Sequence, residues 1–454
     1  MSVVKEDRRG WLRNRQSWPQ VLNRLLSAEL WAALGEGQPR DGNQARAGWT
    51  PRFLLLLSVC IGWSGKRQLG ERFAQGRHVA TQVYPVGGEL PISYQGFFKQ
   101  LSKRGPDWVR SSVLTLRQKG PDYARSGWYR HNWVPFAVDG SRLDAPRTAS
   151  NEEQLGSAGR SGTGPQAWVT LVAHLPTGLL WDWRQGPGTS SERHHLLDMI
   201  ADLPERALVV ADAGFVGYEV MRAMIHAGRP FLIRCGGNVT LLVDEPVGER
   251  ALLRSRQGTR VWLWPDQQRR RRHPPLALRL IVLKRKARRI YLVTNVLSPM
   301  ELPKRMAGEF YQARWGVEVT YRSLKQTMER RKLLARTPAH AQVELAANLL
   351  ALFLLVLHGL LILGVRVHCL SVASALRVLR EAIEALRWGV RWMDFLAAFQ
   401  QALQDDYHRL KPKAARNWPH KKTEKPPGPP MLCRLRAAQR GRLLSIVPEH
   451  CKTG

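Results

Sequence analysis

The spacing of apolar residues predicts helices in the first part of the chain. Apolar positions recur every three or four residues in Val21–Leu34 and in Phe53–Ile61, which is typical of helices with a buried face. Tyr94–Leu101 and Trp108–Leu116 show similar spacing on either side of a glycine–proline break. We therefore expect a helical domain over residues 1–128. Its one-sided basic charge favours DNA binding over an ordinary bundle with a solvated basic face.

From about residue 134 the pattern changes to short apolar runs, which are typical of buried strands. These runs are Val134–Val138, Ala167–Leu175, Leu179–Trp183, Ala207–Ala211 and Pro230–Arg234. Helical stretches separate the later runs, so we predict an α/β fold in which helices flank a mixed sheet. Residues 237–299 offer further short strand patterns and are predicted to form an all-β insertion.

Helical sequence returns after the insertion. Val343–Leu363 is apolar enough and long enough to cross a bilayer. Glu344 and His358 lie within it and are costly in a lone membrane span, so we expect a helix buried inside the protein and no membrane. A membrane protein built around this stretch is the alternative. A helical region is predicted over 366–407 and a basic, disordered tail over 408–454.

The charge balance indicates a polyanionic partner. The chain has 70 Lys and Arg against 36 Asp and Glu, a net charge of +34. An apolar fraction of 44% and 17 tryptophans indicate a large folded core, which argues against a small ribosomal or DNA-coating protein. Five scattered cysteines without a CxxC pair argue against a disulfide framework or a zinc site. No apolar stretch follows the charged N-terminus, so we expect a cytoplasmic protein.

Three acidic residues stand where a catalytic site is expected. Asp139 and Asp212 each follow a short apolar strand and precede a turn of small residues. Ends of neighbouring strands meet at one edge of an open α/β sheet, and a helix carrying Glu318 is expected to pack across that edge. Carboxylates without histidine or thiol favour two Mg²⁺ ions, with Mn²⁺ as a substitute, for phosphoryl transfer. A single aspartate at a strand end is more often a turn residue, so the prediction rests on all three.

The stretch around Glu318 carries cations at helical spacing. Tyr311 and Arg314 lie seven and four positions before Glu318, and Arg322 and Lys325 lie four and seven positions after it. At about 3.6 residues per turn these five side chains share one face of a helix. One carboxylate flanked by three cations is suited to hold a metal and grip a phosphodiester, so we expect the four flanking residues to bind DNA.

The same spacing resembles a family motif. The Y-R-E-K motif of the DDE-type insertion-sequence transposases of the IS-four-like group places two, three and six residues between its four members. Tyr311, Arg314, Glu318 and Lys325 match all four places. The resemblance implies a ribonuclease-H-like catalytic core, here predicted over residues 129–236 and 300–365 on either side of the insertion.

The two aspartate stretches resemble motifs of the same family. Val138–Ser141 is similar to its first motif and Ala211–Phe215 to its second, although many members have arginine where Ala213 stands. The resemblance implies that the three carboxylates hold two Mg²⁺ ions. It also implies that the tyrosine, arginine and lysine of the Y-R-E-K motif hold phosphates near a flipped-out base.

The activity that the resemblance implies is cut-and-paste transposition. Water cleaves one strand at each element end, the freed 3′-OH attacks the opposite strand to give a hairpin, water reopens it, and the 3′-OH ends attack target DNA. The implied partners are double-stranded DNA, as terminal inverted repeats and target, and a second copy of the chain in a synaptic homodimer. The implied location is the nucleoid of a prokaryotic cell. The alternatives are an inactive, transposase-derived DNA-binding protein and a related ribonuclease-H-like nuclease.

Three tryptophans lie near these motifs. Trp262 and Trp264 alternate along a predicted strand of the insertion, so both side chains point to one face. Related transposases stack a flipped base on an aromatic residue of this insertion, which implies base stacking for either residue. Packing in the insertion's own core is the alternative. Trp315 lies off the stripe around Glu318 and is expected in the core.

Overall fold

A computed structural model describes residues 15–36, 49–84, 93–156, 163–285, 288–389, 393–404 and 428–446. The chain divides into two compact units, each built from separate stretches of sequence. The first unit comprises Met1–His131, Gly140–Ser191 and Gly316–Asp405, and the second comprises Asn132–Asp139, Glu192–Trp315 and Asp406–Gly454. The strand β1 (Val134–Asp144) has residues in both units.

The second unit contains strands in the order β10-β6-β7-β8-β9-β5-β4-β1. Besides β1, they are β4 (Ala207–Ala211), β5 (Phe231–Cys235), β6 (Thr240–Val243), β7 (Thr259–Leu263), β8 (Leu276–Arg285), β9 (Arg288–Thr294) and β10 (Met431–Arg434). β1, β4 and β5 pair in parallel. The neighbouring strands in the run β5-β9-β8-β7-β6 pair antiparallel. Every residue of β4 is buried, as expected for a parallel strand with a continuous apolar sequence.

In the first unit, an antiparallel hairpin adjoins the later half of β1. The hairpin consists of β2 (Gln166–His174) and β3 (Leu180–Pro187), with Leu171 opposite Trp183. Strands and flanking helices occur in both units, and the second unit contains both parallel and antiparallel strand pairs. These features confirm the predicted α/β, ribonuclease-H-like mixed sheet.

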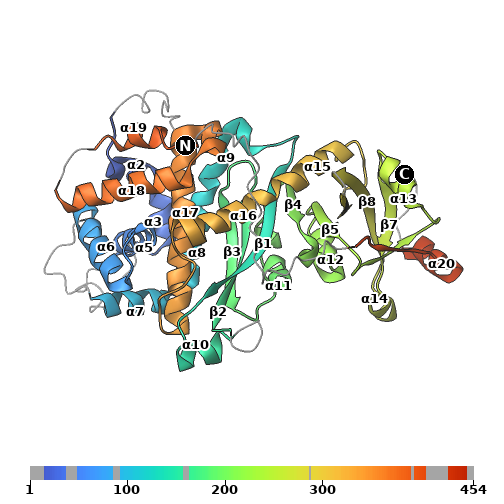
Figure 1. The fold of residues 1–454 in the computed structure, drawn as a ribbon, viewed down its shortest axis with the longest axis horizontal. Helices are drawn as coiled ribbons and strands as arrows, with labels where there is room; N and C mark the ends of the chain where they lie inside the picture. Colours follow the sequence, from blue (N-terminus) through green and yellow to red (C-terminus); the bar gives the residue numbers. More distant parts are fainter. Residues whose placement is uncertain are drawn as a thin grey trace. The chain divides into compact units, whose positions relative to one another are not determined.

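Helices make up most of the rest of the first unit (Figure 1). They are α2 (Trp18–Leu25), α3 (Ala28–Ala33), α5 (Pro51–Trp63), α6 (Leu69–Val83), α7 (Tyr94–Arg104), α8 (Pro106–Leu116), α9 (Gly120–Ala124), α10 (Ala149–Gln154), α16 (Trp315–Arg322), α17 (Pro338–Leu363), α18 (Val372–Arg387) and α19 (Phe395–Gln400). The predicted break between α7 and α8 occurs at Gly105, whose φ of +76° favours glycine.

The second unit also contains helices. They are α11 (Glu192–Leu197), α12 (Tyr218–His226), α13 (Glu249–Arg254), α14 (Asp266–Arg270), α15 (Lys304–Ala313) and α20 (Ala437–Ile446). α13 and α14 lie within the insertion, which therefore contains short helices in addition to the predicted strands. Both begin after a residue that suits a helix start, Gly248 and Pro265, and both are rich in charged and polar residues that favour an exposed turn of helix over a strand.

The apolar helix α17 is buried by protein. Pro338–Cys369 is long and apolar enough to cross a membrane, but 94% of its most apolar window is buried inside the described structure. It packs against α5, α7, α8, α18 and α19 (Figure 1). Its start is set by Thr337, whose Oγ1 accepts a hydrogen bond from His340 N, and by a proline in the first turn.

Two polar residues within α17 make hydrogen bonds to neighbouring segments. Glu344 accepts hydrogen bonds from two backbone N–H groups of the preceding loop, at 2.9 and 2.8 Å. Asn348 Oδ1 accepts a hydrogen bond from Arg330 Nε at 3.2 Å. The same guanidinium donates to the carbonyl oxygens of Gly62 and Ser64 at 3.0 and 2.6 Å, at the end of α5. The polar groups that are costly in a membrane span therefore fix α17 inside the first unit.

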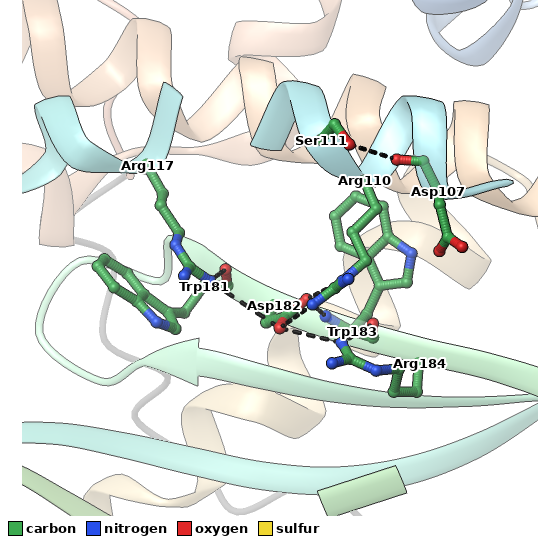
Figure 2. Close-up of polar contacts among 8 residues, drawn as sticks. All are labelled: Asp107, Arg110, Ser111, Arg117, Trp181, Asp182, Trp183 and Arg184. Atoms are coloured by element: carbon green, nitrogen blue, oxygen red, sulfur yellow. Dashed lines mark hydrogen bonds and ion pairs between the residues drawn. The ribbon is translucent and has the colours of Figure 1, made fainter. Parts of the chain in front are cut away.

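A buried carboxylate joins α8 to the hairpin (Figure 2). Asp182 in β3 accepts two hydrogen bonds from Arg110, at 2.9 and 3.1 Å, and one from Arg184 at 3.0 Å. Arg117 lies 3.9 Å from the same carboxylate and donates to the carbonyl oxygen of Trp181 at 2.9 Å. Burial raises the pKa of Asp182, but the hydrogen bonds and charges of Arg110 and Arg184 outweigh burial and hold this pKa below its ordinary value.

The C-terminal stretch differs from its prediction as a disordered tail. Within 408–454, β10 pairs in parallel with β6, and α20 follows it. The prediction was wrong for 428–446, because apolar residues in this basic segment pack on the insertion. The insertion cluster, as we call it, consists of Leu242, Trp262, Trp264, Leu435 and Leu443. The rest of the predicted tail lies outside the described residues.

Candidate active site

Two aspartates occupy neighbouring positions on the parallel strands of the second unit. β1 and β4 pair as far as Ala137 opposite Val210. Asp139 and Asp212 each stand two residues further along, so they are equivalent positions on strands about 4.8 Å apart and point to the same face. Both are half-buried, at the point where the fully buried apolar runs end. The structure thus brings together the two aspartates that the sequence singles out.

Asp212 also shapes the turn that follows β4. Its Oδ1 accepts a hydrogen bond from Gly214 N at 2.9 Å, at the start of a short helical turn, Ala213–Phe215. Asp212 therefore has the capping role that is common for an aspartate at a strand end. A carboxylate has two oxygens with several lone pairs, so the capping bond leaves capacity for a cation.

A further carboxylate approaches this turn. A Cβ added at Gly214 would lie 2.5 Å from Glu192 Oε1 and 3.2 Å from Asp212 Oδ1, so a glycine leaves the room that these carboxylates occupy. The neighbouring Arg193 donates from Nε to the carbonyl oxygen of Gly214 at 2.7 Å. The sequence does not single out Glu192, because its role depends on how α11 packs beside the turn.

Glu318 lies half-buried on α16, and the structure assigns this part of the helix to the first unit. α16 is anchored on the hairpin by Tyr321, whose hydroxyl donates to the carbonyl oxygen of Val169 in β2 at 2.9 Å. Tyr321 stands three residues after Glu318, close to one turn along the helix. The buried tyrosine therefore fixes the turn that carries the predicted third carboxylate.

Lys325 ties the segment after α16 to the later half of β1. Its Nζ donates to Ser141 Oγ and to the carbonyl oxygen of Arg142, both at 2.7 Å. Ser141 follows Asp139 by two residues. The lysine of the Y-R-E-K motif thus has a structural contact that the sequence does not reveal, in addition to its predicted DNA contact.

The single helix expected around Glu318 is divided in the structure. α15 ends at Ala313, α16 begins at Trp315, and Ser323–Thr327 forms a π-helix. The regular α-helix with 3.6 residues per turn therefore does not extend to Lys325. The prediction that all five side chains share one helix face was wrong at this C-terminal end. A π-helical turn widens the helix locally, and such turns are frequent at functional sites.

The remaining residues around Glu318 lie in different surroundings. Tyr311 and Arg314 belong to the second unit, where the Arg314 guanidinium lies 5.8 Å from the centroid of the Tyr311 ring. Arg322 is exposed in the first unit. Trp315 was expected in the core but is 54% exposed, because Val317 takes the buried position on this turn of α16.

The two tryptophans of the insertion are buried. Trp262 and Trp264 are 6% and 4% exposed and share the insertion cluster, so they do point to one face as predicted. Trp264 Nε1 donates to the carbonyl oxygen of His273 at 2.8 Å. These contacts favour the packing alternative, and base stacking by either ring stays a prediction.

Among the residues that the structure describes, no group of three or more His, Cys, Asp or Glu side chains is arranged to hold a metal ion. The paired Asp139 and Asp212 supply hard oxygen donors of the kind that Mg²⁺ takes. A complete set of three carboxylate ligands requires a further residue, and Glu318 is the one that the sequence predicts.

Residues 134–354 match the family described as "Transposase DDE domain". Transposase InsG for insertion sequence element IS4, from Escherichia coli (strain K12), is 27% identical over 267 residues, which cover 53% of this chain and 59% of that protein. The match thus spans less than two thirds of that relative. A solved structure of a piggyBac transposase synaptic complex with hairpin DNA is 13% identical, with a TM-score of 0.38 over 80% of this chain and 87% of that chain.

Proposed function

We propose that this chain, which carries a transposase DDE domain and is IS4-like, is an active DNA transposase that moves an insertion sequence by a cut-and-paste route. The DDE domain covers residues 134–354. Transposases of this family cut and join DNA and generally use divalent metal ions. We propose that the whole chain cuts and joins DNA with divalent metal ions held by Asp139, Asp212 and Glu318.

The paired aspartates carry the proposal. Asp139 and Asp212 stand at equivalent positions on adjacent parallel strands, where two carboxylates attract a cation. Glu318 is proposed as the third ligand because it holds the glutamate place of the Y-R-E-K motif. When bound, two Mg²⁺ ions, or Mn²⁺ in their place, would activate the attacking oxygen and stabilise the leaving oxygen.

The proposed reaction consists of successive phosphoryl transfers. Water attacks a phosphodiester at each element end and releases a 3′-OH and a 5′-phosphate. The 3′-OH attacks the opposite strand and displaces its 3′ oxygen, which gives a hairpin. Water reopens the hairpin, and the 3′-OH ends then attack target DNA. The hairpin step rests on the resemblance to the Y-R-E-K group.

We assign DNA contacts to the residues around Glu318. Arg314 and the exposed Arg322 are suited to phosphate oxygens, since a guanidinium presents paired donors. Tyr311 and Lys325 complete the motif near a flipped-out base. A base-stacking role for Trp262 or Trp264 would require the insertion cluster to open when DNA binds.

The proposed partners follow from the same function. They are double-stranded DNA, as terminal inverted repeats and target, and a second copy of the chain in a synaptic dimer. The net charge of +34 supports a nucleic-acid partner. The burial of α17 supports a protein without a membrane span, in the cytoplasm and at the nucleoid.

A cleavage assay tests the proposal. The purified full chain is incubated with labelled DNA carrying the ends of its own element and with Mg²⁺. Asp139→Ala, Asp212→Ala and Glu318→Ala are each expected to abolish cutting and to retain DNA binding. Glu205→Ala removes an exposed carboxylate just before β4 and is the matched control, which is expected to cut like the wild type.

The outcomes separate the alternatives. DNA binding by the wild-type chain without cutting would identify an inactive DNA-binding protein. Cutting without strand-transfer products would identify a ribonuclease-H-like nuclease. Normal cutting by an alanine variant of any one carboxylate would remove that residue from the proposed site.

A further inference from the structure

A cavity of about 1080 Å³ lies in the second unit, between the insertion and the C-terminal segment 428–446. Six arginines line it, against one aspartate, Asp266. They are Arg193, Arg269, Arg270, Arg434, Arg436 and Arg442. Five of the six are exposed in the described structure, and Arg269 is half-buried. Such a density of guanidinium groups indicates a ligand with several anionic oxygens.

The C-terminal segment contributes half of these arginines. Arg434 ends β10, Arg436 immediately precedes α20, and Arg442 lies in the middle of α20. β10 adds to the edge strand β6 in register, with Met431 opposite Thr240, and Leu435 and Leu443 hold the segment on the insertion cluster. The segment is therefore fixed in place by its apolar residues while its arginines face the cavity.

The insertion provides part of the remaining charge. Arg269 and Arg270 begin the basic run at 269–272, which stands out in the sequence without an assigned role. Arg269 is ion-paired to Asp266, and Arg434 lies 3.4 Å from Glu245. These two acidic residues hold arginines in place but leave the lining strongly positive.

The cavity also adjoins the turn after Asp212. Val216 and Gly217 line it, only four and five residues beyond Asp212. Arg193 lines it as well and donates to the carbonyl oxygen of Gly214, within the Asp212 turn itself. An anionic chain bound in the cavity would therefore lie beside the turn that follows this aspartate.

We propose that the C-terminal segment and the insertion together bind the phosphates of a single DNA strand that leads to the Asp212 turn. The cavity is about as large as pockets that enclose a drug-sized ligand, so it takes a few nucleotides of one strand and not the width of a duplex. The inference rests on the proposed function for the identity of the strand. The proposed site consists of arginines, half of them from the C-terminal segment. It is separate from the three carboxylates and from the Y-R-E-K motif.

Binding measurements on the full chain test this inference. Fluorescence anisotropy follows a labelled duplex with a single-stranded overhang and the same duplex with blunt ends. Arg436→Gln/Arg442→Gln is expected to weaken binding of the overhang DNA about tenfold for each lost contact. The magnitude of the slope of log K against log salt concentration should decrease by about 0.7 for each phosphate contact that the variant loses. Blunt duplex binding should change little.

Arg250→Gln/Arg254→Gln is the matched control. It removes the same charge from α13 in the same unit, from exposed residues that do not line the cavity. Thermal melting verifies that both double variants fold. Equal weakening in the two variants, equal weakening for blunt and overhang DNA, or unchanged binding by Arg436→Gln/Arg442→Gln would each overturn the inference.

Two further arms define the ligand and separate the two proposals. Inorganic tripolyphosphate is expected to compete less well than an oligonucleotide of equal charge, and equal competition would assign the site to free polyphosphate instead. Cutting is measured independently with Mg²⁺. If the wild-type chain does not cut DNA but the arginine variant selectively loses overhang binding, the arginine site is upheld and the transposase activity is rejected. If the wild-type chain cuts DNA but the arginine variant binds the overhang normally, only the arginine site is rejected.

Discussion

At the scale of single residues, Asp182 shows how this basic chain uses its few acidic side chains. Its carboxylate is 1% exposed and contacts Arg110 of α8, Arg117 of the short 3-10 helix that follows α8, and Arg184 of β3. Removing one member of a buried ionic group leaves the other charges without compensation, which costs more than the loss of an exposed pair. Asp182 is therefore expected to be important for the stability of the first unit.

Asp182→Asn is predicted to lower the free energy of unfolding by about 3–5 kcal/mol, measured by urea denaturation at neutral pH. The control is Glu152→Gln, which disrupts the exposed pair with Arg147 at 3.9 Å and should cost at most about 1 kcal/mol. Equal losses in the two variants would show that the buried cluster has no special role.

The same comparison has a predicted pH dependence. The pKa of Asp182 is lowered in the folded protein, so its stabilising contribution is complete above the unfolded-state pKa of about 4 and is lost as the pH falls through the folded-state pKa. The gap in stability between wild type and Asp182→Asn should therefore shrink as the pH falls below about 4. A gap that stays constant there would contradict the lowered pKa.

Residues whose roles follow from local pattern are predictable from the sequence. Asp139 and Asp212 stand out because each ends a buried apolar run, and parallel pairing then places them together. Glu192 does not stand out, because its position beside Gly214 depends on packing between elements. Trp315 was wrongly predicted to be buried for the same reason, because packing around α16 decides which of its residues are buried.

At the scale of elements, the packing of α5 against α17 depends on a small residue. A Cβ added at Gly62 would lie 2.4 Å from Ala351 Cβ, which is closer than real contacts allow, and 3.1 Å from the carbonyl oxygen of Ala347, which is tight. The neighbouring Trp63 donates from Nε1 to the carbonyl oxygen of Ala351 at 2.8 Å. This hydrogen bond fixes the two helices at the distance that only glycine permits at position 62.

Gly62→Ala is predicted to destabilise the protein by about 1–3 kcal/mol through overpacking of α5 against α17. Gly70→Ala is the matched control, because Gly70 lies in α6 with nothing within 4 Å of an added Cβ. The control should be neutral or stabilising by up to about 1 kcal/mol, since alanine favours a helix more than glycine does. Thermal or urea unfolding measures both, and an equal effect of the two substitutions would refute the close approach.

Most strands and long helices could be predicted from the sequence, because their apolar periodicity is strong. β4 and α17 are examples in which nearly every residue is buried. The break between α15 and α16 and the π-helix at Ser323–Thr327 could not be predicted, since the sequence there has unbroken helical spacing. β10 and α20 were missed because a few apolar residues in a basic, proline-rich region give a weak local signal.

At the scale of the whole molecule, the net charge of +34 and the match of residues 134–354 to the transposase DDE domain both favour the proposed DNA partner. Long-range attraction favours binding to any DNA, whereas cutting requires a few residues in exact positions relative to a metal. Charge alone therefore does not test the account. What needs testing is whether Asp139, Asp212 and Glu318 hold the same metal centre, as proposed.

The most direct test is a structure of the full chain bound to DNA ends with Mn²⁺ in place of Mg²⁺, in which anomalous scattering locates the metal. We expect metal at a site that carboxylate oxygens of Asp139, Asp212 and Glu318 approach to about 2 Å. Metal bound elsewhere, or a Glu318 carboxylate that does not reach the centre formed by the two aspartates, would contradict this expectation.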